Sequence, residues 1–293
     1  MRLHDNIRSC RQRIWKVDAF IMMRALWTGA SGMKAQQTNV DTIANNLANV
    51  NTVGYKSQST QFKSLLYQTL RTETTTANGE NKPTTAQVGL GARVASTNTD
   101  YTQGTMQANA SKTALCISGS GFFAVRGADN GTYYTRSGDF TWALDNMGNR
   151  VLATSKGQEV LDYQGNPIML PDGASGDAVS FGTDGSVAYK AADGTYIPTG
   201  QQVALYQFNN PKGLEKTGDS LFEATQASGV PLSEIATAGV TRSTIAQGYL
   251  EASNVNVADE MVNLIVAQRA YEMNSKAITT SDTMLEQANN LKR

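Results

Sequence analysis

Two rows of apolar residues spaced by seven, one near each end of the chain, most constrain how this sequence can fold. A spacing of seven places side chains along one stripe of an α-helix. The N-terminal row is Leu26, Met33, Val40 and Leu47, with Ile43 and Val50 at the complementary position. The C-terminal row is Val257, Leu264, Tyr271, Ile278 and Leu285, with Met261 at the complementary position. The rows predict two terminal helices whose apolar stripes pair as a coiled coil.

The C-terminal helix has the stronger signals. Residues 249 to 293 contain neither Gly nor Pro. Asn256 can cap the start of the helix, and Asp259 and Glu260 lie in its first turn, where the helix dipole favours negative charge. Ile265 lies outside the row of seven, so one partner helix cannot cover every apolar position. A second packing partner is therefore expected.

The N-terminal helix carries glycines that weaken it. Gly29 and Gly32 each cost about 1 kcal/mol relative to Ala, so the first turns need a partner. Gly54 is expected to end the helix in the left-handed conformation that glycine adopts readily. Asn residues at positions 45, 46, 49 and 51 precede it. We expect these amides to form hydrogen bonds across packed helices and helix ends, where a charged group would be costly to bury.

The middle of the chain has a different pattern. Residues 111–214 contain Gly- and Asp-rich turn signals every ten or so residues, which predicts short strands. The expected core of this β-rich domain includes Phe122, Phe123, Val125, Tyr133, Tyr134, Phe140 and Trp142. Residues 58–110 and 215–248 lack clear periodicity and are predicted to be extended connecting arms.

The predicted fold class is α+β, with an all-β domain inserted between paired terminal helices. Residues 23–57 and 249–293 form the helical domain, and residues 111–214 form the outer domain. Residues 1–22 are set apart as an atypical extension because Lys16 and Asp18 interrupt their apolar part and no small-residue cleavage site follows. Met22 or Met23 offers an alternative start.

Charge and residue usage exclude several functions. The 25 basic residues balance the 25 acidic residues, which does not favour nucleic acid as a partner. No run approaches the roughly 20 apolar residues that span a bilayer, so no membrane insertion is expected. The one histidine is His4, and the cysteines are Cys10 and Cys116. We therefore predict no catalytic residues, no cofactor and no metal site. Cys116, in an apolar run, is expected to be a core residue.

Three segments resemble the axial proteins of the bacterial flagellum, the rod and hook group. They are "ANNLANVNTVGYK" from residue 44, "SNVNVADEMVNLIVAQRAYEMNSKAITTSDTMLEQANNL" from residue 253, and the pattern from "ISGSGFFAV" at 117 through "YTRSGDF". Within the group, "FKSLLYQTL" from residue 62 and "QGYLEASNVNV" from residue 247 are most similar to the distal rod protein.

The resemblance implies a structural subunit, not an enzyme, that polymerises into a helical tube. The tube would transmit motor torque to the hook and form part of the export channel. Its implied partners are other copies of the chain, other rod proteins, the hook protein, the P- and L-ring proteins and the type III export apparatus. The implied location is the basal body, from periplasm to outer membrane, reached without a cleaved signal peptide.

The resemblance also implies two sets of site residues. The terminal apolar rows, together with Ile265, would form the assembly interface. The segment after the N-terminal helix, with Phe62, Leu65, Leu66 and Tyr67, would be a wedge between subunits.

Two alternatives stay open at this point. The chain could be a hook or proximal rod subunit, which belongs to the same class of protein. It could also be a secreted carbohydrate binder or enzyme with a helical stalk. That second alternative predicts a concave pocket with convergent polar side chains within residues 111–214.

Overall fold

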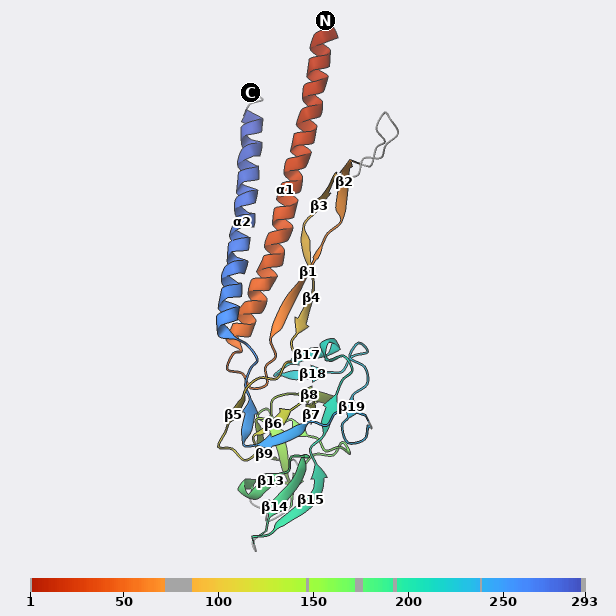
Figure 1. The fold of residues 1–293 in the computed structure, drawn as a ribbon, viewed down its shortest axis with the longest axis vertical. Coiled ribbons are helices and arrows are strands. Elements are labelled where there is room, and N and C mark those ends of the chain that lie inside the picture. The colour runs from red at the N-terminus through yellow and green to blue at the C-terminus, as the bar shows by residue number, and fades with distance from the viewer. Residues whose placement is uncertain are drawn as a thin grey trace. The chain divides into compact units, whose positions relative to one another are not determined.

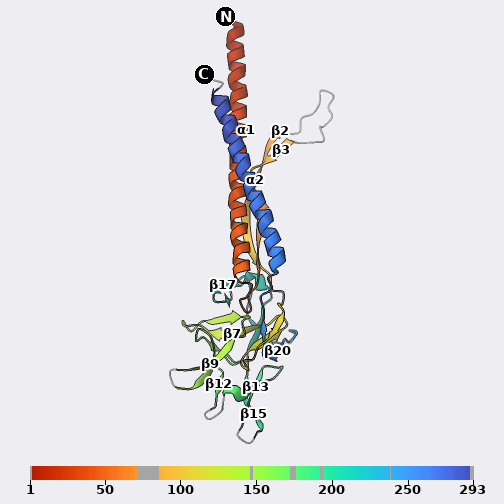
Figure 2. The ribbon, with the colours of Figure 1, turned by 90° about the vertical axis from the view of Figure 1, so that its left-hand side faces the viewer.

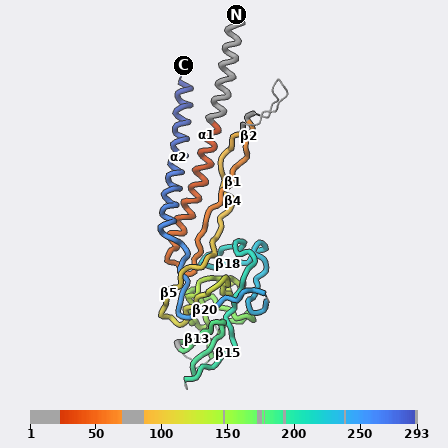
Figure 3. Tube along the Cα trace, in the orientation of Figure 1, coloured from red at the N-terminus to blue at the C-terminus, as the bar shows by residue number. Residues whose placement is uncertain are grey.

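The computed structural model describes residues 2–71, 86–145, 148–171, 176–191, 194–237 and 239–290, with side chains from residue 23 onward except at positions 70, 71, 86 and 177. These residues divide between two compact units. Unit 1 draws on residues 1–45, 58–98 and 258–293, and unit 2 on residues 46–57 and 99–257. Helices dominate unit 1 and strands dominate unit 2, so the predicted α+β class is confirmed. Figure 3 traces the chain through both units.

Unit 1 contains two long helices and a β-ribbon. Helix α1 spans Arg2–Ala48, and helix α2 spans Val257–Asn290. In the ribbon, β1 (Gln58–Ser64) pairs with β4 (Ala92–Thr99), and β2 (Tyr67–Arg71) pairs with β3 (Ala86–Gly89). The helices lie side by side, and the β1–β4 ribbon follows α1 (Figures 1 and 2). Helix α1 runs without a break through residues 2–22, which the sequence set apart as an extension.

The two helices approach closely at the glycines of α1. A Cβ atom added to Gly29 would lie 2.9 Å from Ile278 Cγ1, and one added to Gly32 would lie 2.8 Å from Asn274 Nδ2. The glycines that weaken the isolated helix therefore make room for side chains of α2. Neither of these helices, over its described residues, has an apolar stretch long enough to cross a membrane.

Unit 2 is built around an antiparallel sheet of ten strands. Its main path runs β12-β10-β11-β7-β8-β18-β17, while β9 pairs with β10, β16 with β7, and β19 with β16. Its strands are β7 (Phe122–Arg126), β8 (Thr132–Thr135), β9 (Phe140–Leu144), β10 (Arg150–Thr154), β11 (Glu159–Val160), β12 (Met169–Leu170), β16 (Leu205–Gln207), β17 (Glu215–Gly218), β18 (Leu221–Glu223) and β19 (Leu232–Ser233). Strands β17 to β19 lie beyond residue 214, so this sheet extends past the predicted end of the β domain.

Smaller sheets complete unit 2. Three strands pair in the order β13 (Val179–Phe181), β14 (Ser186–Lys190) and β15 (Tyr196–Gln202). Strand β6 (Leu115–Ser118) pairs with β20 (Thr244–Gln247), and β5 (Met106–Ala108) pairs with β21 (Tyr249–Glu251). Strand β20 lies in the segment predicted as a connecting arm, and β21 lies at the start of the segment predicted as helical. Both strands belong to unit 2.

Strand β7 is buried on both of its faces. Phe123 and Val125 pack into one apolar cluster, and Phe122 and Ala124 pack into a second. Alternating side chains of a strand point to opposite faces of its sheet, so β7 anchors two core layers. The expected core residues Phe122, Phe123, Val125, Tyr134 and Phe140 are buried, while Tyr133 and Trp142 are partly buried against the first cluster. Cys116 is also buried, as predicted.

We expect Phe123→Ala to destabilise the full chain by about 3–5 kcal/mol, because it leaves a cavity beside β7. Phe123 is fully buried, and its ring meets that of Phe140 at a centroid distance of 5.1 Å. The measurement is urea unfolding followed by tryptophan fluorescence. The matched control is Phe62→Ala, which removes an exposed ring and should change the free energy of unfolding by less than about 0.5 kcal/mol. Equal effects of the two substitutions would contradict the assignment of the core.

Candidate assembly surface and buried junction

The carboxylate of Glu251, the last residue of β21, is a buried polar group with partners from several segments of unit 2. Its Oε1 accepts hydrogen bonds from Lys56 Nζ at 2.6 Å and from the backbone N–H of Gly104 at 2.9 Å. Its Oε2 lies 3.4 Å from Arg136 Nη1. The side chains of Lys56 and Glu251 are fully buried, and that of Arg136 is nearly so. Three segments distant in sequence thus meet at one carboxylate.

Backbone carbonyls accept further hydrogen bonds from the two cations of this cluster. Lys56 Nζ also donates to Thr102 O at 2.7 Å, and Arg136 Nη2 donates to Gly119 O at 2.6 Å. Burial lowers the pKa of Lys56 and of Arg136, and the nearby negative charge of Glu251 opposes this lowering in both. The carboxylate therefore favours the charged forms of two buried cations, whose burial would otherwise be more costly.

Further hydrogen bonds hold together the segments of unit 2 that adjoin the helices in sequence. The amide of Asn254 accepts from Ser57 N at 2.8 Å and donates to Asp100 O at 2.9 Å. Gly54 N donates to Glu251 O at 2.8 Å. The residues that lead out of α1, out of the ribbon and into α2 are thereby joined to one another. We call the set formed by Lys56, Arg136, Glu251 and Asn254 the buried junction.

Gly54 has a different role from the one predicted. Helix α1 ends at Ala48, six residues earlier, so the expectation that Gly54 ends the helix is wrong. The left-handed conformation is present, with φ at +69°, and a Cβ atom there would lie 2.5 Å from Ser137 N. Gly54 is required because the backbone of the β domain approaches it, and no other residue leaves that space.

The Asn-rich end of α1 folds back on itself through its amides. Asn46 is fully buried, and its Oδ1 accepts a hydrogen bond from Tyr55 OH at 3.2 Å. Asn49 Oδ1 accepts from Thr52 Oγ1 at 3.1 Å. These bonds shape the turn between the helix and the buried junction. The expectation of hydrogen bonds at the helix end is thus met by Asn46 and Asn49.

A third cation, which is half-buried, lies next to the junction. Lys216 Nζ donates to Lys56 O at 3.1 Å and lies 5.0 Å from the centroid of the Tyr55 ring. No described carboxylate forms an ion pair with it. Burial lowers the pKa of Lys216 to about 8. The carbonyl and the ring face compensate only part of the cost of removing this ammonium group from water.

The predicted interface residues of α2 differ in their exposure. Leu264, Ile278 and Leu285 are half-buried, whereas Val257, Met261, Ile265 and Tyr271 are exposed. Other exposed apolar side chains of α2 are Val262, Val266, Met273 and Met284. In α1 and the turn after it, Ile43 is buried, and Leu26, Met33, Val40, Leu47 and Val50 are half-buried. Helix α2 therefore has an apolar face that α1 does not cover.

The predicted wedge segment lies on the ribbon of unit 1. Phe62 belongs to β1 and Tyr67 to β2, and Leu65 and Leu66 join these strands. Phe62, Tyr67 and Leu66 are exposed, the last by 81%, and Leu65 is half-buried. Hydrogen bonds from Leu65 N to Gly91 O at 2.9 Å and from Leu90 N to Leu66 O at 3.1 Å continue the ribbon through the join. These four residues thus form an ordered apolar edge.

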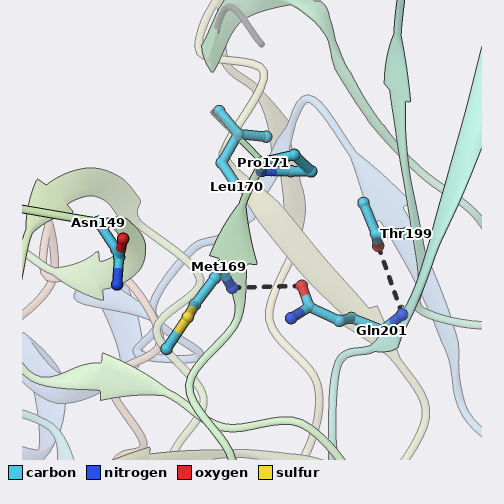
Figure 4. A pocket seen from close by; sticks show the side chains of 6 residues that line it. All are labelled: Asn149, Met169, Leu170, Pro171, Thr199 and Gln201. Atoms are coloured by element: carbon cyan, nitrogen blue, oxygen red, sulfur yellow. Dashed lines mark hydrogen bonds between the residues drawn. The ribbon is translucent and has the colours of Figure 1, made fainter. Parts of the chain in front are cut away.

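The β domain has a pocket that tests the enzyme or carbohydrate-binder alternative. It measures about 310 Å³ and is lined by Asn149, Met169, Leu170, Pro171, Thr199 and Gln201 (Figure 4). Gln201 Oε1 accepts from Met169 N at 3.2 Å, and Thr199 Oγ1 donates to Val187 O at 2.8 Å. Two of its three polar side chains are thus used to join strands. The lining of this pocket includes no carboxylate and no aromatic ring, so this pocket does not support that alternative.

Comparisons with known families cover most of the chain. The family described as "Flagella basal body rod protein" matches residues 26–56, and the "Flagellar hook protein FlgE/F/G D1 domain" matches residues 116–189. The "Flagellar basal body rod FlgEFG protein C-terminal" family matches residues 246–291. The first match includes Lys56, the second Arg136, and the third Glu251 and Asn254. All four residues of the buried junction therefore lie within the matched segments.

Individual relatives align along nearly the whole chain. The flagellar basal-body rod protein FlgG of Borreliella burgdorferi is 46% identical over 275 residues, which are 93% of this chain and 100% of the relative. FlgG of Buchnera aphidicola subsp. Acyrthosiphon pisum is 39% identical over 92% of this chain and 100% of its own length. FlgG of Bacillus subtilis is 38% identical over 93% of this chain and 100% of its own length.

We expect Glu251→Ala to destabilise the chain by about 3–5 kcal/mol, because Lys56 and Arg136 would stay buried without their counter-charge. The matched control is Lys156→Ala, which breaks the exposed ion pair with Asp219 and should cost less than about 1 kcal/mol. Both values come from denaturant unfolding of the full chain. Similar losses from the two variants would show that the junction does not hold unit 2 together.

Lys216 should make stability depend on pH in alkaline solution. Its pKa is about 8 in the folded chain against an ordinary value of 10.5, so between these values the unfolded chain binds more protons at this site. The free energy of unfolding contributed by Lys216 therefore rises as pH increases through that window. We expect the free energy of unfolding to gain about 1–2 kcal/mol. This is less than the whole difference between the two pKa values would give, because the side chain retains contact with solvent. The measurement compares unfolding curves across this pH range for the unaltered chain and Lys216→Met, and equal slopes would contradict it.

Proposed function

The chain belongs to the family of flagellar basal-body rod proteins FlgG, and from this membership we propose that it is a structural subunit of the bacterial flagellar distal rod. The observation that carries the proposal is the similarity at 46% identity over the full length of a FlgG relative. The family is structural and not enzymatic. A subunit of the rod would occupy the flagellar basal body and assemble with copies of itself.

The exposed face of α2 supports polymerisation. Val262, Ile265 and Val266 are each more than half exposed in the single chain. Burying such a side chain contributes roughly 1.5–3 kcal/mol, so a few of them stabilise a subunit contact substantially. We propose that this face and the terminal apolar rows form the assembly interface. A contact between unlike surfaces produces a helical filament when its rotation does not close into a ring.

Finer features of the proposal rest on the family. We propose that the terminal helices pair as a coiled coil within the polymer, and that the apolar edge from Phe62 to Tyr67 is the wedge between subunits. The polymer would act as a drive shaft that transmits torque to the hook and would enclose part of the export channel. Other rod proteins, the hook protein, the P and L rings and the type III export apparatus would be its partners, and the rod would extend from the periplasm to the outer membrane.

The direct test is complementation. The source bacterium without its own copy of the gene should lack complete rods and should not swim, and expression of this chain should restore both. Electron cryotomography of basal bodies, with a density tag on the chain, then places it in the distal rod, the proximal rod or the hook. Density in the hook or at the proximal end would contradict the distal assignment.

A substitution on the exposed face of α2 separates assembly from folding. Val266 is 63% exposed, so we expect Val266→Asp to leave the free energy of unfolding within about 0.5 kcal/mol and to abolish rod assembly. The control is Gln268→Asp, an exposed position two residues away that receives the same charge. The measurements are swimming and the yield of basal bodies. Normal rods built from Val266→Asp chains would exclude this face from the interface.

A further inference from the structure

A groove in unit 1 has no assigned role. It lies between α1 and the ribbon and measures about 500 Å³. Trp27, Ala30, Leu65 and Val94 contribute apolar surface. The groove also includes the hydroxyls of Ser31 and Thr38, but Ser31 Oγ donates to Thr28 O at 2.9 Å and Thr38 Oγ1 donates to Lys34 O at 3.2 Å. The walls therefore present mainly apolar groups to an occupant.

The groove carries positive charge. Lys34 and Arg93 both line it, and both residues are exposed. Neither forms an ion pair with any residue whose side chain the structure describes. An occupant that matches the groove combines an apolar surface with negative charge.

The first three turns of α2 have that combination. They carry Asp259 and Glu260 and contain no Lys or Arg before Arg269. The exposed side chains of Met261, Val262, Ile265 and Val266 lie in the same three turns. Later turns of α2 contain both Arg269 and Lys276, so they match the charge of the groove less well.

The same chain cannot place these turns in its own groove. Where α1 carries the groove, its own α2 contributes Asn274 and Ile278, which contact α1 at Gly32 and Gly29. The turns around position 263 lie roughly 15–20 Å further along the helix, at 1.5 Å per residue. A second copy, displaced along the axis by about this distance, brings them level with the groove.

We propose that the groove between α1 and the ribbon receives the first three turns of α2 from a second copy of this chain. The inference rests on the proposed function and specifies one of its subunit contacts. Groove and helix are different surfaces of one chain, so each copy offers one of each and the contact can repeat from copy to copy, as a filament requires. The apolar side chains of α2 fill the groove, while Lys34 and Arg93 meet its acidic first turn.

Disulfide cross-linking tests the contact in assembled rods. The full chain carries Cys10→Ser, which leaves Cys116, a buried residue, together with Ala30→Cys and Val266→Cys. It is expressed in the source bacterium without its own gene, and isolated basal bodies are treated with a mild oxidant. We expect a ladder of covalent multimers on a non-reducing gel, because each copy bonds to one neighbour through each cysteine. Chains with either cysteine alone should give no ladder.

The matched control is the pair Ala30→Cys and Met284→Cys, since Met284 is an exposed apolar residue at the other end of α2. The inference is overturned if the Met284 pair gives a ladder and the Val266 pair does not. It is also overturned if the Val266 pair gives no ladder in bacteria that swim. Either result leaves the proposed function standing. If the unaltered chain restores neither rods nor swimming, the proposed function is wrong and the inference with it.

A charge exchange tests the contact independently of the cysteines. We expect Arg93→Glu to reduce swimming and basal-body yield at least several-fold, and Asp259→Arg in the same chain to restore them, since every contact then regains opposite charges. Rescue supports the proposal. Unchanged swimming of the Arg93→Glu strain, or loss that Asp259→Arg does not reverse, overturns it.

Discussion

The buried carboxylate of Glu251 is the interaction on which the rest of the structure depends. It holds Lys56, which follows α1 in the chain, and Arg136, which follows β8, and it accepts from the backbone of Gly104. A buried ion pair adds little net stability compared with apolar residues of the same size, but it is costly to break. Its effect is therefore selective, because only the arrangement that brings all three segments together compensates the buried charges. We infer that it fixes the paths by which the chain enters and leaves unit 2.

The sequence predicts the elements of this fold better than it predicts their contacts. Heptad spacing indicated both helices, yet it placed Met261 and Leu264 in one seam, and the first is exposed while the second is half-buried. The period of seven shows that a helix has an apolar stripe but does not show which of two adjacent stripes meets the partner helix. Gly29 and Gly32 were interpreted as weak points because helix propensity describes an isolated helix. Their benefit appears only when Asn274 and Ile278 of α2 come close.

The sequence does not predict the buried junction, because its contacts join residues that are distant in the chain. Lys56 and Glu251 are 195 residues apart, and neither has a local pattern that distinguishes it from an ordinary surface charge. Similarly, the sheet continues through β17 and β18 although "EKTGDSLFE" has no clear alternation, because Leu221 and Phe222 gain their burial from strand β8 and the aromatic cluster around Phe122. Local periodicity reports how a segment can bury its own apolar side chains. It does not report charges that are compensated only in the folded chain.

Buried charge pairs and exposed apolar side chains have different roles in this chain. The buried ion pairs of Glu251 with Lys56 and Arg136 form within unit 2 and use no residue of another copy. Unit 1 leaves Val262, Ile265 and Val266 exposed on α2, and it leaves Trp27 exposed at its groove. Apolar contacts tolerate small adjustments as helices slide into place, whereas a buried charge cluster at the same position would have to be desolvated correctly at every addition. The buried charge pairs, which need correct geometry, can therefore form once within each chain. The apolar contacts, which tolerate small adjustments, can form between chains.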